Sequence, residues 1–114
     1  MRFTVAEILE MIRKNDMRRF YNSWEWRKLS HAVIAENHNE CYLCQHRGRV
    51  TPAVITHHVN ELKKRPDLAY SRTFVDDKGK IQRQLMPLCW QCHEEIHERG
   101  QFAFLAHFTN EERW

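Results

Sequence analysis

The sequence contains no hydrophobic run that approaches the ~20 apolar residues of a membrane-spanning helix, so we expect no membrane insertion. It has only three glycines and three prolines among 114 residues, and it shows neither internal repeats nor low-complexity linkers. Its first residues, MRFTVAEILEMIRKND, lack the continuous apolar region of a signal peptide. These absences and the short length predict one domain that stays in the cytoplasm.

Four cysteines are present, and they form two C-x-x-C pairs, Cys41/Cys44 and Cys89/Cys92. Disulfides are rare in cytoplasmic proteins, and two such pairs are more typical of one structural zinc site. Two buried thiol pairs or a redox C-x-x-C are the alternatives, but a redox motif would need a βαβ context that we do not find. A domain of this length buries only a modest core, so a metal site would add useful stability.

Positive charge is concentrated near the N-terminus. The formal net charge is +3, and residues 1–30 hold seven Lys or Arg against four acidic residues. The rest of the chain holds eleven basic and eleven acidic residues, so the whole excess lies in residues 1–30. The aromatic residues Phe20, Tyr21, Trp24 and Trp26 accompany these cations. The combination suits contact with nucleic-acid phosphates, and equally a solvated helix face above an aromatic core. The candidate DNA-binding residues in this region are Arg18, Arg19, Arg27 and Lys28.

Local patterns in the first third of the chain predict two helices. Thr4 and Glu7 form a capping-box pattern, and the apolar spacing that follows predicts a helix to about residue 19. Asn22 or Ser23 can cap a second helix, which ends near the segment ENHNE. One face of this second helix carries the apolar residues Trp26, Leu29 and Val33.

Short strands and a third helix are predicted further along. β-Branched residues predict a strand over residues 53–59, and FVDDKGKIQ predicts two short strands around a turn at residues 77–79. A helix is expected from Trp90 to Arg99, where Gly100 would stop it.

Four histidines have the spacing of a second metal site. His93 and His97 are four residues apart on the expected helix, so both imidazoles project from one face. His57 and His58 are adjacent at the end of an expected strand, so they project to opposite sides. One of that pair can bind the ion while the other remains as a base, which gives three nitrogen ligands and one unligated imidazole. Adjacent histidines can also be surface residues without a function.

These motifs together resemble the HNH endonucleases encoded by tailed phages and prophages. The resemblance covers about residues 20 to 98, and its segments are FYNSWEWRKL, CYLC, VTPAVITHHV and LCWQCHEEIH. It implies an α+β fold with a small ββα-metal (His-Me finger) core, a four-cysteine zinc site and an N-terminal helical extension. The parts of the single domain would be a basic helical extension (1–36), the zinc site with the core (41–99) and an aromatic tail (100–114).

The resemblance also assigns roles to individual residues. It implies that His58 is the general base and that His57, His93 and His97 bind the catalytic divalent ion. Gln84 stands where the family has an asparagine, whose amide braces the loop that carries the base histidine. Glutamine has the same amide and one more methylene, so the brace could survive with altered geometry or fail.

The function that the resemblance implies is metal-dependent hydrolysis of DNA phosphodiester bonds. The ion could be Mn²⁺, Ni²⁺, Co²⁺, Zn²⁺ or Mg²⁺, and imidazole ligands favour the first four. Phage relatives commonly assist genome packaging, so a terminase or portal is an expected partner, in the host cytoplasm if a phage encodes the chain. The alternatives are a zinc-stabilised DNA-binding module without nuclease activity and a structural packaging adaptor. Further DNA-contacting cations are expected in the loop after His58, at Lys63, Lys64 and Arg65.

Overall fold

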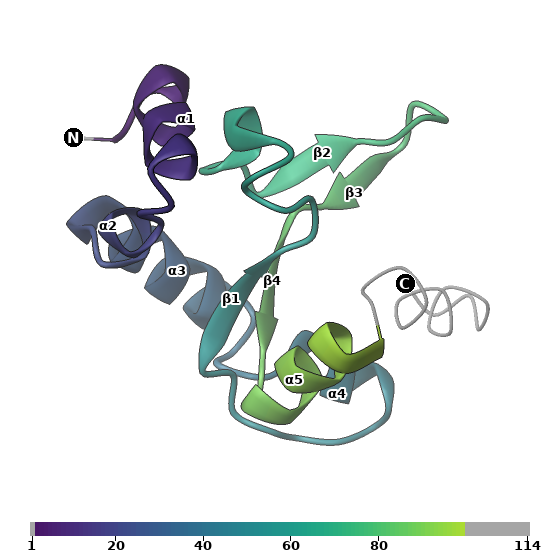
Figure 1. Ribbon diagram of the computed structural model, residues 1–114. Coiled ribbons are helices and arrows are strands. Elements are labelled where there is room, and N and C mark those ends of the chain that lie inside the picture. The colour runs from purple at the N-terminus through teal and green to yellow at the C-terminus, as the bar shows by residue number, and fades with distance from the viewer. Residues whose placement is uncertain (1, 100–114) are drawn as a thin grey trace.

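The computed structural model describes residues 2–99, and for residues 97–99 it describes the backbone alone. The fold is α+β, and its parts are arranged around one pair of strands near the centre (Figure 1). The elements in chain order are α1 (Val5–Arg13), α2 (Arg18–Tyr21), α3 (Trp24–Glu36), α4 (Tyr42–His46), β1 (Ile55–His58), a 3₁₀ turn (Pro66–Leu68), β2 (Thr73–Val75), β3 (Ile81–Arg83), β4 (Leu85–Leu88) and α5 (Trp90–Arg99).

The N-terminal helix begins as predicted but ends early. The Thr4 hydroxyl accepts from the Glu7 amide, and the Glu7 carboxylate accepts from the Thr4 amide, which confirms the capping box. The prediction of one helix to residue 19 is wrong, because Asn15 adopts a left-handed conformation (φ 54°) and separates α1 from α2. Asparagine tolerates this conformation better than most residues do. The break lets Phe20 of α2 join the core that α1 also lines.

The second predicted helix is confirmed as α3. Ser23 is its N-cap, and the Ser23 hydroxyl accepts a hydrogen bond from the Trp26 amide. Trp26, Leu29 and Val33 are buried, as their helical spacing predicted. This face of α3 packs against β1 and β4.

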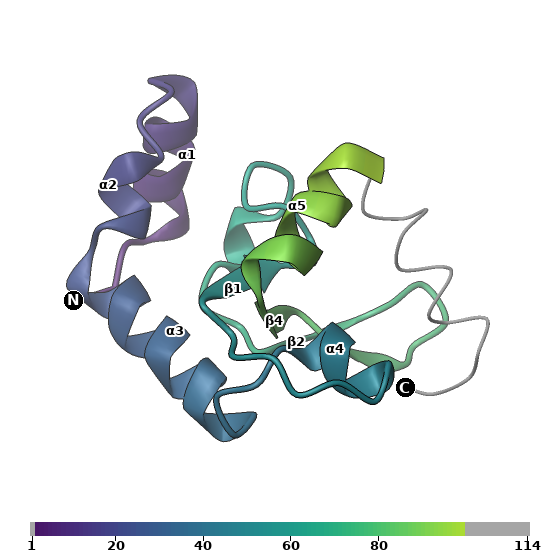
Figure 2. The ribbon, with the colours of Figure 1, turned by 90° about the horizontal axis from the view of Figure 1, so that it is seen from below.

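An antiparallel pair, β1 with β4, separates α3 on one side from α5 and α4 on the other (Figure 2). The register places His57 opposite Met86 and His58 opposite Leu85. The strand that the sequence predicted over residues 53–59 is shorter, at Ile55–His58, and β4 was not predicted. All four β4 residues are buried, so no alternation marks the strand, and Pro87 disguises it further.

Two clusters of buried side chains lie on the two faces of this strand pair. Met86 and Leu88 belong to the cluster that contains the four cysteines and Ile96 of α5. Leu85 belongs to the cluster formed by the N-terminal helices, with Phe20 and Trp26. The strands therefore divide the molecule into a cysteine-containing half and a helical half.

The predicted pair of short strands is confirmed as β2 and β3, which form an antiparallel hairpin. Gly79 in its turn has φ 78°, a conformation that glycine adopts at little cost. Among the described residues, no helix has the length and apolar character needed to cross a membrane. The predicted stop at Gly100 and the aromatic tail lie outside the described residues.

Candidate active site and metal centre

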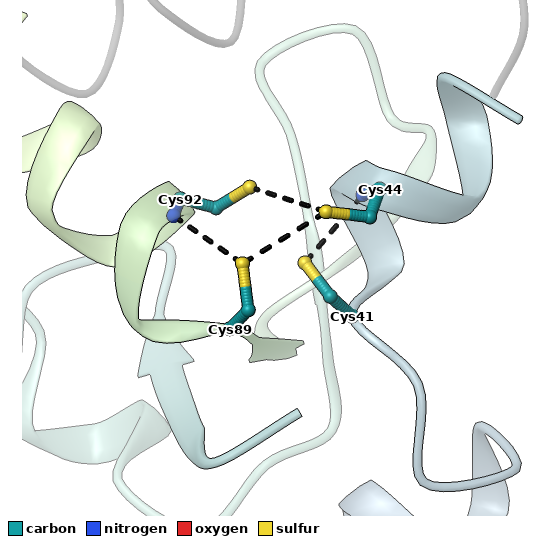
Figure 3. Close-up of side chains that lie close together, drawn as sticks. All are labelled: Cys41, Cys44, Cys89 and Cys92. Atoms are coloured by element: carbon teal, nitrogen blue, oxygen red, sulfur yellow. Dashed lines mark hydrogen bonds between the residues drawn. The ribbon is translucent and has the colours of Figure 1, made fainter. Parts of the chain in front are cut away.

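The four cysteines converge on one point, as Figure 3 shows. All four are buried and none forms a disulfide, and their sulfur atoms lie within 4.8 Å of one another. Cys44 Sγ lies 3.8 Å from the Sγ atoms of both Cys89 and Cys92. A tetrahedral ion with metal–sulfur distances of about 2.3 Å needs sulfurs about 3.8 Å apart, so these donors fit one such ion.

Local backbone geometry prepares this cluster. Cys41 is the N-cap of α4, and its sulfur accepts from the Cys44 amide at 3.5 Å. Cys89 precedes α5, and its sulfur accepts from the Cys92 amide at the same distance. Both contacts lie at the N-terminus of a helix, where the helix dipole favours negatively charged sulfur. Each pair thus presents two sulfurs from one short turn.

The ionisation of each of these thiols depends on its cysteine neighbours. Hydrogen bonds, first from Cys92, lower the pKa of Cys41 to about 5 despite burial. The pKa of Cys92 is raised, first by its hydrogen bond to Cys41 and then by burial. Burial also raises the pKa of Cys44. A thiolate at one cysteine therefore disfavours ionisation of the neighbouring thiols. A bound cation is required before all four thiols can ionise together.

His57 and His93 meet on the cysteine-containing side of β1. Their ring centroids are 5.8 Å apart with an interplanar angle of 74°, and both side chains are half-buried. Metal–nitrogen distances of about 2.1 Å allow two imidazoles at this separation to share one ion. The arrangement follows from the alternation of β1, because His57 points away from the helical half, and from the packing of α5 against β1.

The backbone of His97 lies in α5, one turn beyond His93. An i, i+4 pair lies on one face of a helix, so the backbone is compatible with a third ligand beside His57 and His93. The side chain of His97 lies outside the described residues.

His58 points to the opposite side of β1, into the helical half. The side chain is 5% exposed, and its ring stacks on Trp26 at 4.5 Å between centroids and an interplanar angle of 21°. His58 Nε2 lies 3.0 Å from the carbonyl oxygen of Ala69. Since a carbonyl oxygen only accepts, Nε2 carries the proton and Nδ1 of the neutral ring has the lone pair.

The surroundings of His58 favour its neutral form. Burial lowers the pKa of this imidazole below its usual value, and the hydrogen bond to Ala69 opposes that effect only in part. A neutral imidazole with one unprotonated nitrogen is able to take a proton from water.

Gln84 occupies the buried position before β4 and binds the loop that follows His58. Its Oε1 accepts from the backbone amide of Asn60 at 3.0 Å and from Asn60 Nδ2 at 2.8 Å. Its Nε2 donates to the Asn60 carbonyl at 3.0 Å, and its own backbone carbonyl accepts from the amide of Val59. The side chain is fully buried. The amide therefore fixes the chain two residues after His58.

A groove of about 930 Å³ connects the two faces. His57, His58 and His93 all line it, together with Trp26 from α3. Groove residues outside these four include Asn15, Arg18, Tyr21, Ser30, Glu61 and Lys63. The candidate ligands and the candidate base therefore open into one space, and the cations Arg18 and Lys63 also line it.

The seven cations predicted to bind DNA are all exposed, but their surroundings differ. Arg18 and Lys63 line the groove. Arg65 forms two hydrogen bonds with the Asp67 carboxylate, and Lys64 lies 3.7 Å from Glu61. The remaining three, on or beside α2 and α3, are Arg19, which lies over Phe3, Lys28, which lies over Trp24, and Arg27, which contacts Asn22.

Sequence reasoning missed three residues around the site. Trp26 was predicted to be buried, but nothing in the sequence connects it with His58, 32 positions later. The Ala69 carbonyl and the Asn60 amide are backbone groups whose place depends on the loop after β1. No residue-type pattern marks such groups.

The strand pair β1–β4 followed by α5, with a four-cysteine cluster at the base of that helix, is the arrangement of a ββα-metal protein of the HNH type. A similar solved structure is the crystal structure of the HNH endonuclease of the deep-sea thermophilic bacteriophage GVE2 with a manganese ion. It superposes with a TM-score of 0.61 at 26% sequence identity, over 81% of this chain and 89% of that chain. No family model and no curated protein matches the sequence.

The chain thus resembles phage HNH endonucleases in structure as well as in its motifs. This similarity supports a nuclease of the HNH type.

Proposed function

We propose that the protein is a metal-dependent DNA endonuclease in which His57, His93 and His97 bind one divalent ion and His58 is the general base. The observation that carries the proposal is the meeting of His57 and His93 on one face of β1, while His58, the next residue, lines the same groove. Manganese in the similar phage structure makes Mn²⁺ the first ion to assay.

The catalytic ion, when bound, would polarise the scissile phosphate and neutralise the leaving 3′ oxygen. His58 Nδ1 takes the proton of the attacking water, while Nε2 stays bonded to the Ala69 carbonyl. Trp26 and Ala69 keep the ring in one orientation. The products of this hydrolysis would be a 5′-phosphate and a 3′-hydroxyl.

The proposal includes a structural zinc ion on Cys41, Cys44, Cys89 and Cys92. Thiolate sulfur in tetrahedral geometry is typical of zinc, and the 3.8 Å sulfur separations support it. The ion would join α4 to the start of α5 and so fix the helix that carries His93.

The test is incubation of supercoiled plasmid with Mn²⁺, Ni²⁺, Co²⁺, Zn²⁺ or Mg²⁺ and the purified protein. We expect nicking or linearisation by the wild type and a rate about 10²–10⁴-fold lower for His58→Ala. His31→Ala, an exposed histidine of α3, is the matched control and should cleave as the wild type does. Full activity of His58→Ala would remove this residue from the mechanism.

A gel-shift assay beside the plasmid assay tests another function. A gel shift without nicking would favour a zinc-stabilised DNA-binding module, as would a Gln84 amide that failed to brace the loop. Gln84 makes three hydrogen bonds with Asn60, and this supports the nuclease instead.

A role in phage genome packaging, with a terminase or portal as partner, is a further part of the proposal that depends on the resemblance to phage proteins. Co-purification with a phage terminase would support it. A protein that neither nicks nor shifts DNA but co-purifies with the terminase would instead favour a structural adaptor.

A further inference from the structure

The Ala69 carbonyl, which accepts the hydrogen bond from His58 Nε2, belongs to a loop that the N-terminal segment contacts. The next residue after Ala69 is Tyr70, and its hydroxyl oxygen accepts a hydrogen bond from the backbone amide of Phe3 at 3.0 Å. The two bonded residues are 67 positions apart. This bond therefore connects the start of the chain with the immediate surroundings of His58.

Aromatic packing extends the same connection. The Tyr70 ring lies 5.5 Å from that of Phe20, and Phe20 lies 6.0 Å from His58 and 5.3 Å from Trp26, between ring centroids. Ala69 is 1% exposed, so a shift of its carbonyl requires movement of packed neighbours. The Tyr70 ring alone accounts for the packing against Phe20. The Tyr70 hydroxyl adds a directional hydrogen bond to the Phe3 amide.

We propose that Tyr70 is a positioning residue for His58, and that the Phe3–Tyr70 hydrogen bond fixes the orientation and tautomer of the base through the Ala69 carbonyl. The inference rests on the proposed function of His58. When the carbonyl is held, the proton stays on Nε2 and Nδ1 remains the atom that accepts a proton. When Tyr70 is released, Ala69 moves relative to His58, and part of the population has a misplaced or wrongly protonated ring.

The direct test is Tyr70→Phe, which removes the hydroxyl and keeps the ring that packs on Phe20. We expect a kcat for Mn²⁺-dependent plasmid cleavage about tenfold lower, because small errors in the position of a catalytic group are costly. KM and the melting temperature should stay near the wild-type values. Tyr42→Phe, a tyrosine that packs against the cysteine-containing cluster, is the matched control and should cleave normally.

A second variant breaks the same bond from its other end. Phe3→Pro removes the donor N–H, and its control Phe3→Ala removes the ring but keeps that N–H. We expect Phe3→Pro to lower kcat more than Phe3→Ala does. The double variant Phe3→Pro with Tyr70→Phe should be no slower than the slower single variant, because both changes remove one bond. Additive losses would overturn the inference.

A measurement without substrate separates this inference from the proposed nuclease function. The ¹⁵N signals of His58 report its tautomer, and the wild type should show the proton on Nε2 before any catalytic ion is added. Tyr70→Phe should add Nδ1-protonated population. If the wild type does not cleave but the His58 signals still differ between the wild type and Tyr70→Phe, the nuclease function is contradicted and the positioning role is not. Unchanged signals together with a wild-type kcat in Tyr70→Phe would overturn the positioning role alone.

Discussion

Adjacent residues of β1 have opposite surroundings, and this difference separates their proposed roles. His57 is half-buried beside the His93 ring, where it faces a second imidazole. His58 is buried against the Trp26 ring, and burial lowers the pKa of its imidazole. Because strand residues alternate in direction, His57 is placed to bind an ion with His93, and His58 is placed to act as a neutral base. A shift of one residue in register would exchange the two roles.

The contacts of Gln84 give a prediction for a single residue. Gln84→Ala leaves the amide and carbonyl groups of Asn60 without their partner and opens a cavity before β4. We expect the free energy of unfolding to fall by about 1–3 kcal/mol, because the loss of a buried hydrogen-bond partner is costly. Cleavage should also slow, since the loop that follows His58 loses its brace. Urea denaturation together with the plasmid assay measures both effects.

Gln84→Asn is the control for this prediction, because it restores the amide with one methylene fewer. Its stability should lie between those of Gln84→Ala and the wild type. If Gln84→Ala matched the wild type in both measurements, the Asn60 contact would have no importance for the site.

At the scale of elements, the sequence predicted the beginnings of α1 and α3 and the end of α3, but it did not predict the end of α1. Thr4 and Ser23 are capping residues with a direct local signal, and both begin helices where expected. The end of α1 depends on Asn15, a single residue within a pattern that continues to look helical. The strand β4 was missed because both of its faces are covered, so burial there is a property of the tertiary structure.

The cysteine cluster gives the prediction that belongs to the elements α4 and α5. Cys41→Ser or Cys92→Ser removes one thiolate, and we expect loss of tightly bound zinc together with unfolding of the domain. Apparent zinc binding energies of about 10–16 kcal/mol equal or exceed the stability of a typical small domain. Metal analysis and circular dichroism measure the two losses.

Acidification should have the same effect, because protons compete with the ion for thiolates. The raised pKa values of Cys44 and Cys92 mean that metal binding releases protons, so the apparent affinity falls as the pH falls. A folded Cys92→Ser variant without bound metal would show that the cluster is not needed for the fold.

At the scale of the whole molecule, side chains of both halves line one groove. The cysteine-containing half supplies His57 and His93, and the helical half surrounds His58. The motifs predicted the set of histidines but not this division, because the sides of β1 are defined only once α3 and α5 have packed. In the basic N-terminal region, Phe20 and Trp26 are buried, whereas Tyr21 and Trp24 are exposed beside the cations.

The exposed cations give a prediction about the binding of DNA to the whole molecule. Arg18 lines the groove, whereas Arg65 is already bonded to the Asp67 carboxylate. Arg18→Gln should weaken binding to plasmid-derived duplexes of different sequence about equally and reduce the salt slope by about one. Arg65→Gln should have a smaller effect on both. Fluorescence anisotropy across salt concentrations measures this, and equal effects of the two variants would exclude a special role of the groove.

The proposed mechanism requires two separate metal sites, one with sulfur ligands and one with nitrogen ligands. Titration of the zinc-loaded protein with Ni²⁺ by calorimetry tests this claim most directly, with His57→Ala, His93→Ala and the control His31→Ala beside the wild type. We predict one Ni²⁺ site in the wild type and in His31→Ala, and loss of that site with retained zinc in the other two variants. Unchanged Ni²⁺ binding in both His57→Ala and His93→Ala would contradict the claim.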